Sequence, residues 1–567
     1  MNLQPLLQFS RLLLLSAIIM PHAAKSLANP QAIVVGAGPV GMAASLILAT
    51  RHGYDVTLLE SSPESSSQAK YDPTKAFLYN VNARGQTLTK MFPSMHDKLV
   101  ARGVESRGFS DATFTIVPAD PNVPIPQKQK MDKSFELKED DDKENKKQLQ
   151  SVTKSEKAAS PGYWIPRHEM VTLMAECIQE HNDNLGTNKG GKISFLTGRE
   201  CLDVSPGTSC VNVKIRTGAR DNITLQANLV IGADGMNSKV RECLSHSADG
   251  TWNASSPKPK LFQLQKYVSP ASFLRIKVLQ LPPRFEIPDA NNNPALVTNS
   301  ENIYAIRSIH KGPRNYLSLG LLPMKNNNAI RPTNIVTRPD HEVWTLKDGK
   351  SIKSWFEEAF PRMKFDGMIS DEEWERFAKA EGTRFPYCQH SKGMAVWDES
   401  GNNGVALVGD AIHAFPPDIG QGVNAGLMDV VCLDRALSGL DTVCGKPITE
   451  SKQLYTLADN LARYQQQHAP EIAALIRLAR FGAPYQYRQP HRADKFSRTL
   501  WTMNVALRLI LNKITFKLIQ PSCIILSQRP ELTFRQVMRR ADLTTLLLKA
   551  VVLGVIGVKC RVCFGFA

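Results

Sequence analysis

Hydrophobic residues near the start of the chain change their spacing in a way that predicts a strand, a helix and a second strand. Residues 32–35 form a short apolar run, and most of residues 56–60 are apolar as well. Short apolar runs of this length are typical of buried strands. Residues 40–49 between them are small and apolar and long enough for a helix. Because two parallel strands need such a crossover, the pattern predicts a βαβ unit and an α/β domain.

Later segments follow other patterns. Residues 252–396 contain alternating runs, such as 273–278 and 316–322, that are separated by Pro-rich loops. Alternation with a period of two is typical of strands with one buried face. Beyond residue 429 the pattern is mostly helical. We therefore expect a sheet-based second unit and then a helical C-terminal region.

The first residues have the composition of a targeting segment. Arg11 precedes an apolar run at residues 12–20, and Pro21 and several small residues follow. These are the charged, apolar and small-residue parts of a secretory signal peptide. We expect residues 1–28 to be a signal or targeting segment. An uncleaved anchor and an organelle leader are the alternatives.

The last residues predict contact with a membrane. Residues 543–567 begin with an apolar run that is interrupted by few polar residues. Upstream, apolar residues recur at helical spacing between 507 and 518, with Arg508, Lys513 and Lys517 among them. Basic amphipathic helices of this kind bind anionic membrane surfaces. We expect membrane association through this region, with a helix packed on the globular body as the alternative.

The charge of the chain narrows the class of partner. The 69 Lys and Arg residues outnumber the 53 Asp and Glu residues and give a formal net charge of +16. Such a balance favours anionic ligands or surfaces. No nucleic-acid-binding motif accompanies it, so we do not expect a nucleic-acid partner. Residues 127–160 are rich in charge and poor in large apolar residues, and we expect a disordered insertion there.

The cysteines do not predict a metal site. Cys560 and Cys563 form a single C-x-x-C pair, and no second pair could complete a zinc site. The pair lies beside the apolar C-terminal run, where lipidation is an alternative to chance. We expect no metal.

A glycine-rich turn follows the first predicted strand. Gly36 permits a tight turn, Gly38 lets a diphosphate approach the backbone, and Gly41 lets the helix pack close to the strand. Glu60 ends the second predicted strand, where a carboxylate can bind the ribose hydroxyls of an adenosine. These features predict a dinucleotide site, but they do not distinguish NAD from FAD.

Two further motifs lie downstream. One contains Asp234 and Gly235 within residues 231–241. The other begins with Gly409 and Asp410 and continues through Pro417 to a glycine-rich helix start. That helix start contains Gly420, Gln421, Gly422 and Asn424.

At these motifs the chain resembles the group A flavoprotein aromatic hydroxylases. The resemblance implies that FAD occupies the dinucleotide site, that Asp234 and Gly235 contact it, and that Asp410 binds its ribityl hydroxyls. It places Pro417 over the reacting edge of the flavin and Asn424 near the substrate, which makes both candidates for the catalytic centre. The glycine-rich helix start would offer backbone donors to the flavin pyrimidine.

The same resemblance adds two basic residues and a reaction. Arg84 and Arg167 match positions that touch the cofactor in this family, with surface arginines as the alternative. The implied activity is FAD-dependent monooxygenation of a small aromatic substrate with NADPH and O2. The branch that acts on L-kynurenine, which is membrane-associated, shows the greatest similarity. The compartment would be the endoplasmic reticulum and secretory route or the mitochondrial outer membrane.

The chain also departs from the family. Asp418 and Ile419 replace aromatic residues before the glycine-rich helix start, which changes the wall nearest the flavin. Arg107 is near the place of a carboxylate-binding arginine, without a sure alignment. A flavin epoxidase or reductase that acts on a membrane lipid or quinone is therefore an alternative function. A non-catalytic flavin-binding redox module is another.

The predicted fold class is α/β, with a Rossmann-like FAD-binding domain, an inserted sheet-based substrate domain and a C-terminal helical region. The FAD-binding domain is expected in three parts, at residues 29–126, 161–250 and 397–440. The substrate domain is expected at 251–396, and the helical region at 441–542 precedes the apolar tail.

Overall fold

A computed structural model describes most of the chain. It covers residues 29–63, 77–106, 113–126, 129–130, 161–186, 190–218, 221–325, 330–447, 455–487 and 489–564. The predicted targeting segment 1–28, Arg107 and all of the predicted insertion except 129–130 lie outside the described residues.

A six-stranded sheet forms the core of the first unit. Its order is β22 (Ala395–Trp397), β23 (Gly404–Leu407), β12 (Leu229–Gly232), β1 (Gln31–Val35), β2 (Asp55–Leu59) and β8 (Ile193–Leu196). All neighbours are parallel except β22 and β23. The helix α2 (Pro39–His52) connects β1 to β2, so the predicted βαβ unit is confirmed.

Burial explains why these segments are so apolar. In β1, every residue after Gln31 is buried, because β1 lies between β2 and β12. Strands of a parallel sheet covered on both faces carry continuous apolar runs. The helix α2 contacts α6 (Arg167–Asp183) and α10 (Gly422–Leu437), and α10 contacts α11 (Leu457–Phe481). An antiparallel sheet of β9 (Glu200–Pro206), β10 (Val211–Arg216) and β11 (Asn222–Ala227) flanks this unit.

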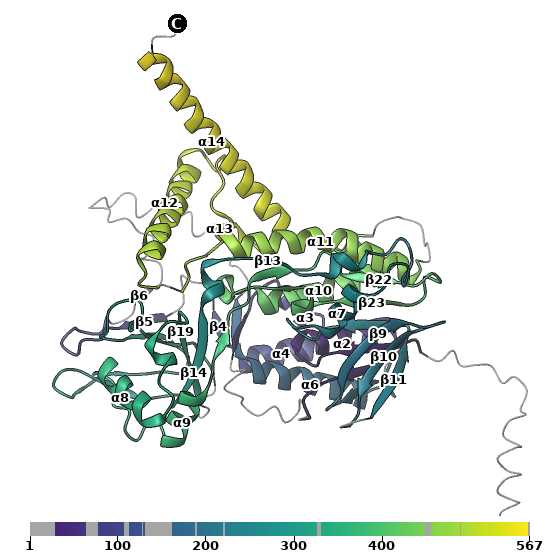
Figure 1. Cartoon of the computed structure of the whole chain (residues 1–567), viewed down its shortest axis with the longest axis horizontal. Helices are drawn as coiled ribbons and strands as arrows, with labels where there is room; N and C mark the ends of the chain where they lie inside the picture. Colours follow the sequence, from purple (N-terminus) through teal and green to yellow (C-terminus); the bar gives the residue numbers. More distant parts are fainter. Residues whose placement is uncertain are drawn as a thin grey trace, which may run out of the picture.

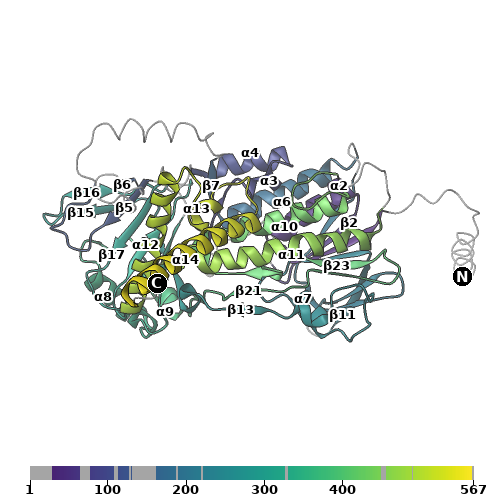
Figure 2. The same cartoon turned by 90° about the horizontal axis from the view of Figure 1, so that it is seen from above.

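A seven-stranded sheet forms the second unit. Its order is β20 (Thr383–Arg384), β14 (Arg275–Leu281), β19 (Arg331–Thr337), β18 (Ser318–Leu321), β17 (Ile303–Arg307), β5 (Thr113–Val117) and β6 (Gln129–Lys130). The helices α8 (Gly349–Ala359) and α9 (Asp371–Lys379) belong to it and share its aromatic core. The two units lie side by side along the long axis of the molecule (Figure 2).

One part of the predicted domain division differs from the structure. Our boundaries place residues 113–117 in the FAD-binding domain, whereas β5 pairs in parallel with β17 of the second sheet. This pairing joins segments almost two hundred residues apart, which local patterning does not reveal. The predicted fold class itself is confirmed.

Two small antiparallel sheets lie between the larger units. One has the order β3 (Leu78–Val81), β7 (Gly162–Pro166) and β4 (Val104–Ser106). The other has the order β13 (Gln265–Tyr267), β21 (Cys388–His390) and β24 (His413–Ala414). Further helices are α3 (Gln86–Thr89), α4 (Pro93–Arg102) and α7 (Lys239–His246), and β15 (Glu286–Pro288) pairs with β16 (Pro294–Val297).

The C-terminal region is helical, as predicted. It consists of α12 (Arg492–Ile514), α13 (Cys523–Ser527) and α14 (Phe534–Phe564). The helices α12 and α14 project from the body of the molecule (Figure 1). Among the residues that the structure describes, none of the helices has both the length and the apolar character needed to cross a bilayer.

Candidate functional site

The turn between β1 and α2 can be built only with small residues. Gly36 has φ 101°, and a Cβ there would lie 2.5 Å from the carbonyl oxygen of Ala233. A Cβ on Gly41 would lie 1.9 Å from the carbonyl oxygen of Gly36. A Cβ on Gly38 would meet no atom within 4 Å, so the N-terminus of α2 opens there onto free space. Free space beside helix N–H groups is what a bound diphosphate requires.

Glu60 lies beside the same turn, as the sequence predicts. Its Oε2 accepts a hydrogen bond from the backbone N–H of Ala37 at 3.1 Å, and its Oε1 accepts one from Ser62 N–H at 3.0 Å. The carboxylate is therefore fixed at the end of β2, beside the glycine-rich turn. Each oxygen keeps acceptor capacity for a ribose hydroxyl.

Asp234 supports the motif that follows β12. Its Oδ2 accepts hydrogen bonds from the N–H groups of Lys239 and Val240, at 2.6 and 3.1 Å, at the start of α7. Its Oδ1 is buried and has no hydrogen-bond partner among the described residues. Burial raises the pKa of Asp234, although hydrogen bonds from Ser238 and the helix oppose this. Asp234 therefore has a structural role at the start of α7, and its contact with the cofactor stays a prediction.

Arg241 joins the second motif to the third. Its Nη1 donates to the carbonyl oxygen of Ala411 at 2.7 Å, and its Nη2 donates to that of Met236 at 3.0 Å. The side chain is buried. Two segments that are far apart in the sequence are therefore fixed to one another next to the dinucleotide turn.

Asp410 lies in the short helix η8 (Gly409–Ala411) that follows β23. Its side chain is exposed, yet the surrounding protein raises its pKa by desolvation. Tyr79 of β3 and Arg167 at the start of α6 lie nearby. Burial raises the pKa of Tyr79 to about 12, with Arg167 opposing and Asp410 adding to the shift. Tyr79, which no sequence motif indicates, therefore lies within reach of the charges of both Arg167 and Asp410. The contact of Arg167 with the cofactor stays a prediction.

A buried network holds the turn that carries Asp410. The Oδ2 of Asp429 accepts hydrogen bonds from Gly409 N–H at 2.8 Å and lies 2.8 Å from His413 Nε2. The Oδ1 of Asp429 lies 2.7 Å from His468 Nε2. Burial acts to raise the pKa of Asp429, but the two histidines hold it well below its usual value. Burial acts to lower the pKa of His468, but Cys432 and Asp429 raise it well above the ordinary value.

The glycine-rich start of α10 forms the far side of the site. Gly420 has φ 60°, and a Cβ at Gly420 or Gly422 would meet no atom within 4 Å. The first turn of α10 contains no acidic residue and no side-chain cap. The Oε1 of Gln421 is buried and has no hydrogen-bond partner among the described residues. The positive end of the α10 dipole is therefore not neutralised by the protein, and it could stabilise negative charge that develops on a bound ligand.

Asn424 holds the neighbouring loop. Its Oδ1 accepts a hydrogen bond from Asn82 N–H at 2.9 Å. Its Nδ2 donates to the carbonyl oxygens of Asn80 at 2.8 Å and Gly420 at 3.0 Å. Both N–H donors are in use, so these contacts give Asn424 a positioning role. The predicted catalytic role stays a prediction, as does that of Pro417, which lies in the short helix η9 (Pro417–Ile419).

Arg84 makes contacts that the sequence did not indicate. Its guanidinium donates to the carbonyl oxygens of Ser527, Arg529 and Leu532, at 2.7, 3.0 and 2.6 Å. It also lies 4.8 Å from the ring centroid of Phe534. Arg84 therefore fastens the C-terminal helices to the segment beside Asn82. Its contact with the cofactor stays a prediction.

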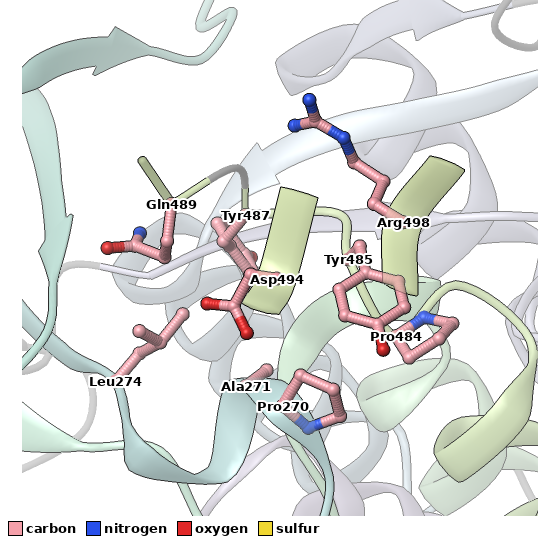
Figure 3. Close-up of a pocket in the computed structure, with 9 residues that line it drawn as sticks. All are labelled: Pro270, Ala271, Leu274, Pro484, Tyr485, Tyr487, Gln489, Asp494 and Arg498. Carbon is pink, nitrogen blue, oxygen red and sulfur yellow. The ribbon is translucent and has the colours of Figure 1, made fainter. Parts of the chain in front are cut away.

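Two hollows of the surface lie apart from these motifs. One, of about 10 Å³, is lined by residues of the loop before α12 and by Pro270, Ala271 and Leu274 (Figure 3). It can hold about one water molecule. The other, of about 430 Å³, is lined by polar residues around β10 and β11. Within the described part of the chain, His, Cys, Asp and Glu side chains form no cluster that could hold a metal ion.

Comparison with known proteins agrees with this geometry. The FAD binding domain family matches residues 186–440. A kynurenine 3-monooxygenase of Candida albicans is 24% identical over 432 residues, which cover 75% of each chain. A 3-(3-hydroxy-phenyl)propionate/3-hydroxycinnamic acid hydroxylase of Burkholderia cenocepacia is 25% identical over 248 residues. That match covers 44% of this chain and 36% of the relative, so the chain spans about a third of its length.

The chain is thus similar to FAD-dependent aromatic hydroxylases over much of its length. A solved structure of 2-methyl-3-hydroxypyridine-5-carboxylic acid oxygenase, in its tetrameric form, has a TM-score of 0.49 and 16% identity. The match covers 86% of this chain and 96% of the solved chain. The glycine cradle, Glu60 and Asp410 fit FAD, because they combine open space at two helix starts with carboxylates that can accept sugar hydroxyls.

Proposed function

We propose that this chain is an FAD-dependent monooxygenase that hydroxylates a small aromatic substrate with NADPH and O2. The observation that carries the proposal is the position of Asp410. Asp410 is exposed next to Gly409, which lies against Val40 of α2 and Gly426 of α10, and it belongs to the segment that matches the FAD binding domain family. When bound, FAD supplies the redox chemistry, by accepting a hydride and activating oxygen.

The protein's contribution is binding, orientation and electrostatics. The N–H groups at the start of α2 would bind the diphosphate, and Glu60 would hold the adenosine ribose. Asp410, near Tyr79, would accept the ribityl hydroxyls. The dipole of α10 would stabilise negative charge on the pyrimidine side of the reduced cofactor.

L-kynurenine is our first candidate for the substrate. Its support is the similarity to a kynurenine 3-monooxygenase over three quarters of the chain. The test is product analysis after purified protein is incubated with NADPH, O2 and a panel of aromatic acids that includes L-kynurenine. We expect one hydroxylated product per NADPH consumed. Oxidation of NADPH without any hydroxylated product from the panel would contradict this assignment.

The presence of Asp418 supports a second candidate function. A carboxyl stands where the resembling family has an aromatic side chain, so the substrate wall differs. An epoxidase or reductase that acts on a membrane lipid or quinone is consistent with such a change. Including an apolar quinone and an unsaturated lipid in the panel distinguishes the two candidates, because only one class would stimulate NADPH oxidation.

We also propose that the C-terminal region lies on an anionic membrane surface. The support is a row of exposed apolar side chains on α12, spaced three and four residues apart: Phe496, Leu500, Met503, Leu507, Ile510 and Ile514. Lys495, Arg498 and Lys513 belong to the same helix. An apolar row with basic neighbours suits the interface of a bilayer. On this proposal the compartment is the endoplasmic reticulum or the mitochondrial outer membrane.

A further inference from the structure

The larger of the two surface hollows lies away from the cofactor motifs. Its volume is about 430 Å³, and it is bounded by the turn between β9 and β10, by the end of β11 and by Gln31. Gln31 begins β1, whereas Gly36 follows the last residue of this strand, so the hollow and the glycine-rich turn lie at opposite ends of β1. The sheet of β9, β10 and β11 lies at the end of the molecule opposite the second unit (Figure 1). The hollow is therefore separate from the dinucleotide site.

Asn228 fixes one wall of this hollow. Its Oδ1 accepts a hydrogen bond from the backbone N–H of Gln31 at 3.0 Å, and its Nδ2 donates to Oδ1 of Asn403 at 3.1 Å. Its backbone N–H donates to the carbonyl oxygen of Gln31, and its carbonyl oxygen accepts from Gly404 N–H, both at 2.9 Å. Because the starts of β1 and β23 meet at this residue, the wall is formed before any ligand binds, as in most small-molecule sites.

Two amide side chains on β10 and β11 belong to another wall. The Oδ1 of Asn212 accepts a hydrogen bond from Nε2 of Gln226 at 3.3 Å and one from the thiol of Cys210 at 3.7 Å. Within the described structure, Nδ2 of Asn212 and Oε1 of Gln226 have no hydrogen-bond partner. A Cβ on Gly207 would lie 2.9 Å from this Nδ2, so glycine leaves the space that the amide occupies. A free donor and a free acceptor are thus held side by side.

The lining of the hollow selects for a neutral polar ligand. Thr208 and Ser209 add two hydroxyl groups, and none of the described residues that line the hollow carries a charge. An ion would lose its hydration here without meeting an opposite charge. An apolar ligand would leave the amides and hydroxyls unpaired. Neighbouring hydroxyl groups of one ligand both donate and accept, so they suit the free donor of Asn212 and the free acceptor of Gln226.

We propose that this hollow binds a neutral sugar, whose adjacent hydroxyl groups pair with Asn212 and Gln226. The volume lies within the range of about 300–1,000 Å³ that is usual for small-molecule sites. The terminal residue of a glycan and a free monosaccharide offer the same hydroxyl groups. This inference is independent of the proposed monooxygenase activity, because the site is at the other end of β1 from the glycine-rich turn.

Saturation-transfer NMR on the FAD-loaded protein tests the proposal. The probes are D-glucose, D-galactose and D-mannose, and we expect titratable saturation transfer to at least one of them. Asn212→Leu combined with Gln226→Leu should weaken its binding at least about tenfold. Asn222→Leu is the matched control, since it removes an exposed amide from the other end of β11 and should leave the affinity unchanged. Methyl α-D-glucopyranoside distinguishes the two sources, because only a glycan end lacks a free anomeric hydroxyl.

A single substitution covers the case in which the double variant does not fold. Gln226 is exposed, so Gln226→Leu should fold and weaken sugar binding about threefold or more. Absence of saturation transfer to all three sugars would overturn the proposal. So would equal affinity of wild-type protein and the Gln226→Leu variant, or displacement of the sugar by inorganic phosphate. These readouts need neither NADPH nor turnover, so they are separate from a failure of the monooxygenase proposal.

Discussion

The backbone N–H of Gly409 donates a 2.8 Å hydrogen bond to Oδ2 of Asp429. This bond fixes the turn that carries Asp410 to the middle of α10, and His413 and His468 complete the partners of the carboxylate. The turn that carries Asp410 is therefore positioned by a network of buried side chains.

Removing the Asp429 carboxylate should destabilise the protein as well as weaken cofactor binding. Asp429→Ala leaves two buried imidazoles and the Gly409 N–H without their acceptor. Breaking a buried pair by removing one partner costs about 3–5 kcal/mol. The free energy of unfolding of the apoprotein, measured with denaturant, should decrease by this amount relative to wild type. A decrease below about 1 kcal/mol would show that the network contributes little.

Asp410→Ala should affect the cofactor without affecting the fold. The side chain is exposed, and substitutions of exposed residues usually change stability little. We expect purified protein with the same melting temperature as apo wild type and with little bound FAD. Absorbance of the flavin relative to protein measures this. Stoichiometric flavin in the variant would contradict the assignment of Asp410.

The glycines of the first turn offer a matched pair of variants. Gly41→Ala places a methyl group 1.9 Å from a carbonyl oxygen, so it should destabilise even the apoprotein. Gly38→Ala meets no protein atom within 4 Å, so it should leave the apoprotein stable and obstruct only the diphosphate. Denaturant unfolding of the two apoproteins measures the effect on stability, and titration with FAD measures the effect on cofactor binding. If Gly38→Ala binds FAD as wild type does, the diphosphate does not lie at this turn.

Stability should depend on pH through Asp418. The pKa of Asp418 is raised to about 8 in the folded protein, whereas in the unfolded chain it is about 4. Below about pH 4 the carboxyl is protonated in both states and costs no stability. As pH rises from about 4 through 8, the unfolded chain releases this proton more readily, so the free energy of unfolding falls. The groups that face Asp418 are Cys388 and Tyr487, both titrating at higher pH. Asp418→Asn should therefore exceed wild type in unfolding free energy by an amount that grows between pH 4 and 8, to about 3–5 kcal/mol. A difference that is constant with pH would contradict the raised pKa.

Membrane attachment can be tested with vesicles that contain phosphatidylserine. Met503→Glu with Leu507→Glu places two charges in the exposed apolar row of α12. We expect co-sedimentation of the wild-type protein and at least a tenfold weaker association of the variant, because two apolar contacts are lost and two anionic repulsions are added. Ile223→Glu changes an exposed apolar residue on β11 and is the control. If the α12 variant and the control bind equally well, α12 is not the attachment site.

The sequence predicted those parts of the site that depend on local chemistry. Gly36, Gly41 and Glu60 could be found because steric limits and strand endings set their spacing. Tyr79 could not be found, since its place beside Asp410 depends on the pairing of β3 with β7. The contacts of Arg84 with carbonyls more than four hundred residues away were equally invisible.

The division into domains shows the same limit. The alternating runs of the second unit were recognisable, but β5 joins that sheet from a segment more than 130 residues before it. Likewise, Asn424 looked like a ligand-binding residue because it lies in a motif. Its three hydrogen bonds to the loop at residues 80–82 and to Gly420 become visible only when the fold brings β3 against α10.

The most direct test of the central claim is the source of the oxygen atom in the product. Purified protein with FAD, NADPH and its aromatic substrate should be incubated under oxygen-18 gas in ordinary water, and the product should be analysed by mass spectrometry. A monooxygenase incorporates one atom of oxygen-18 into each product molecule. A product without the label, or labelled only when the water carries oxygen-18, would contradict the claim.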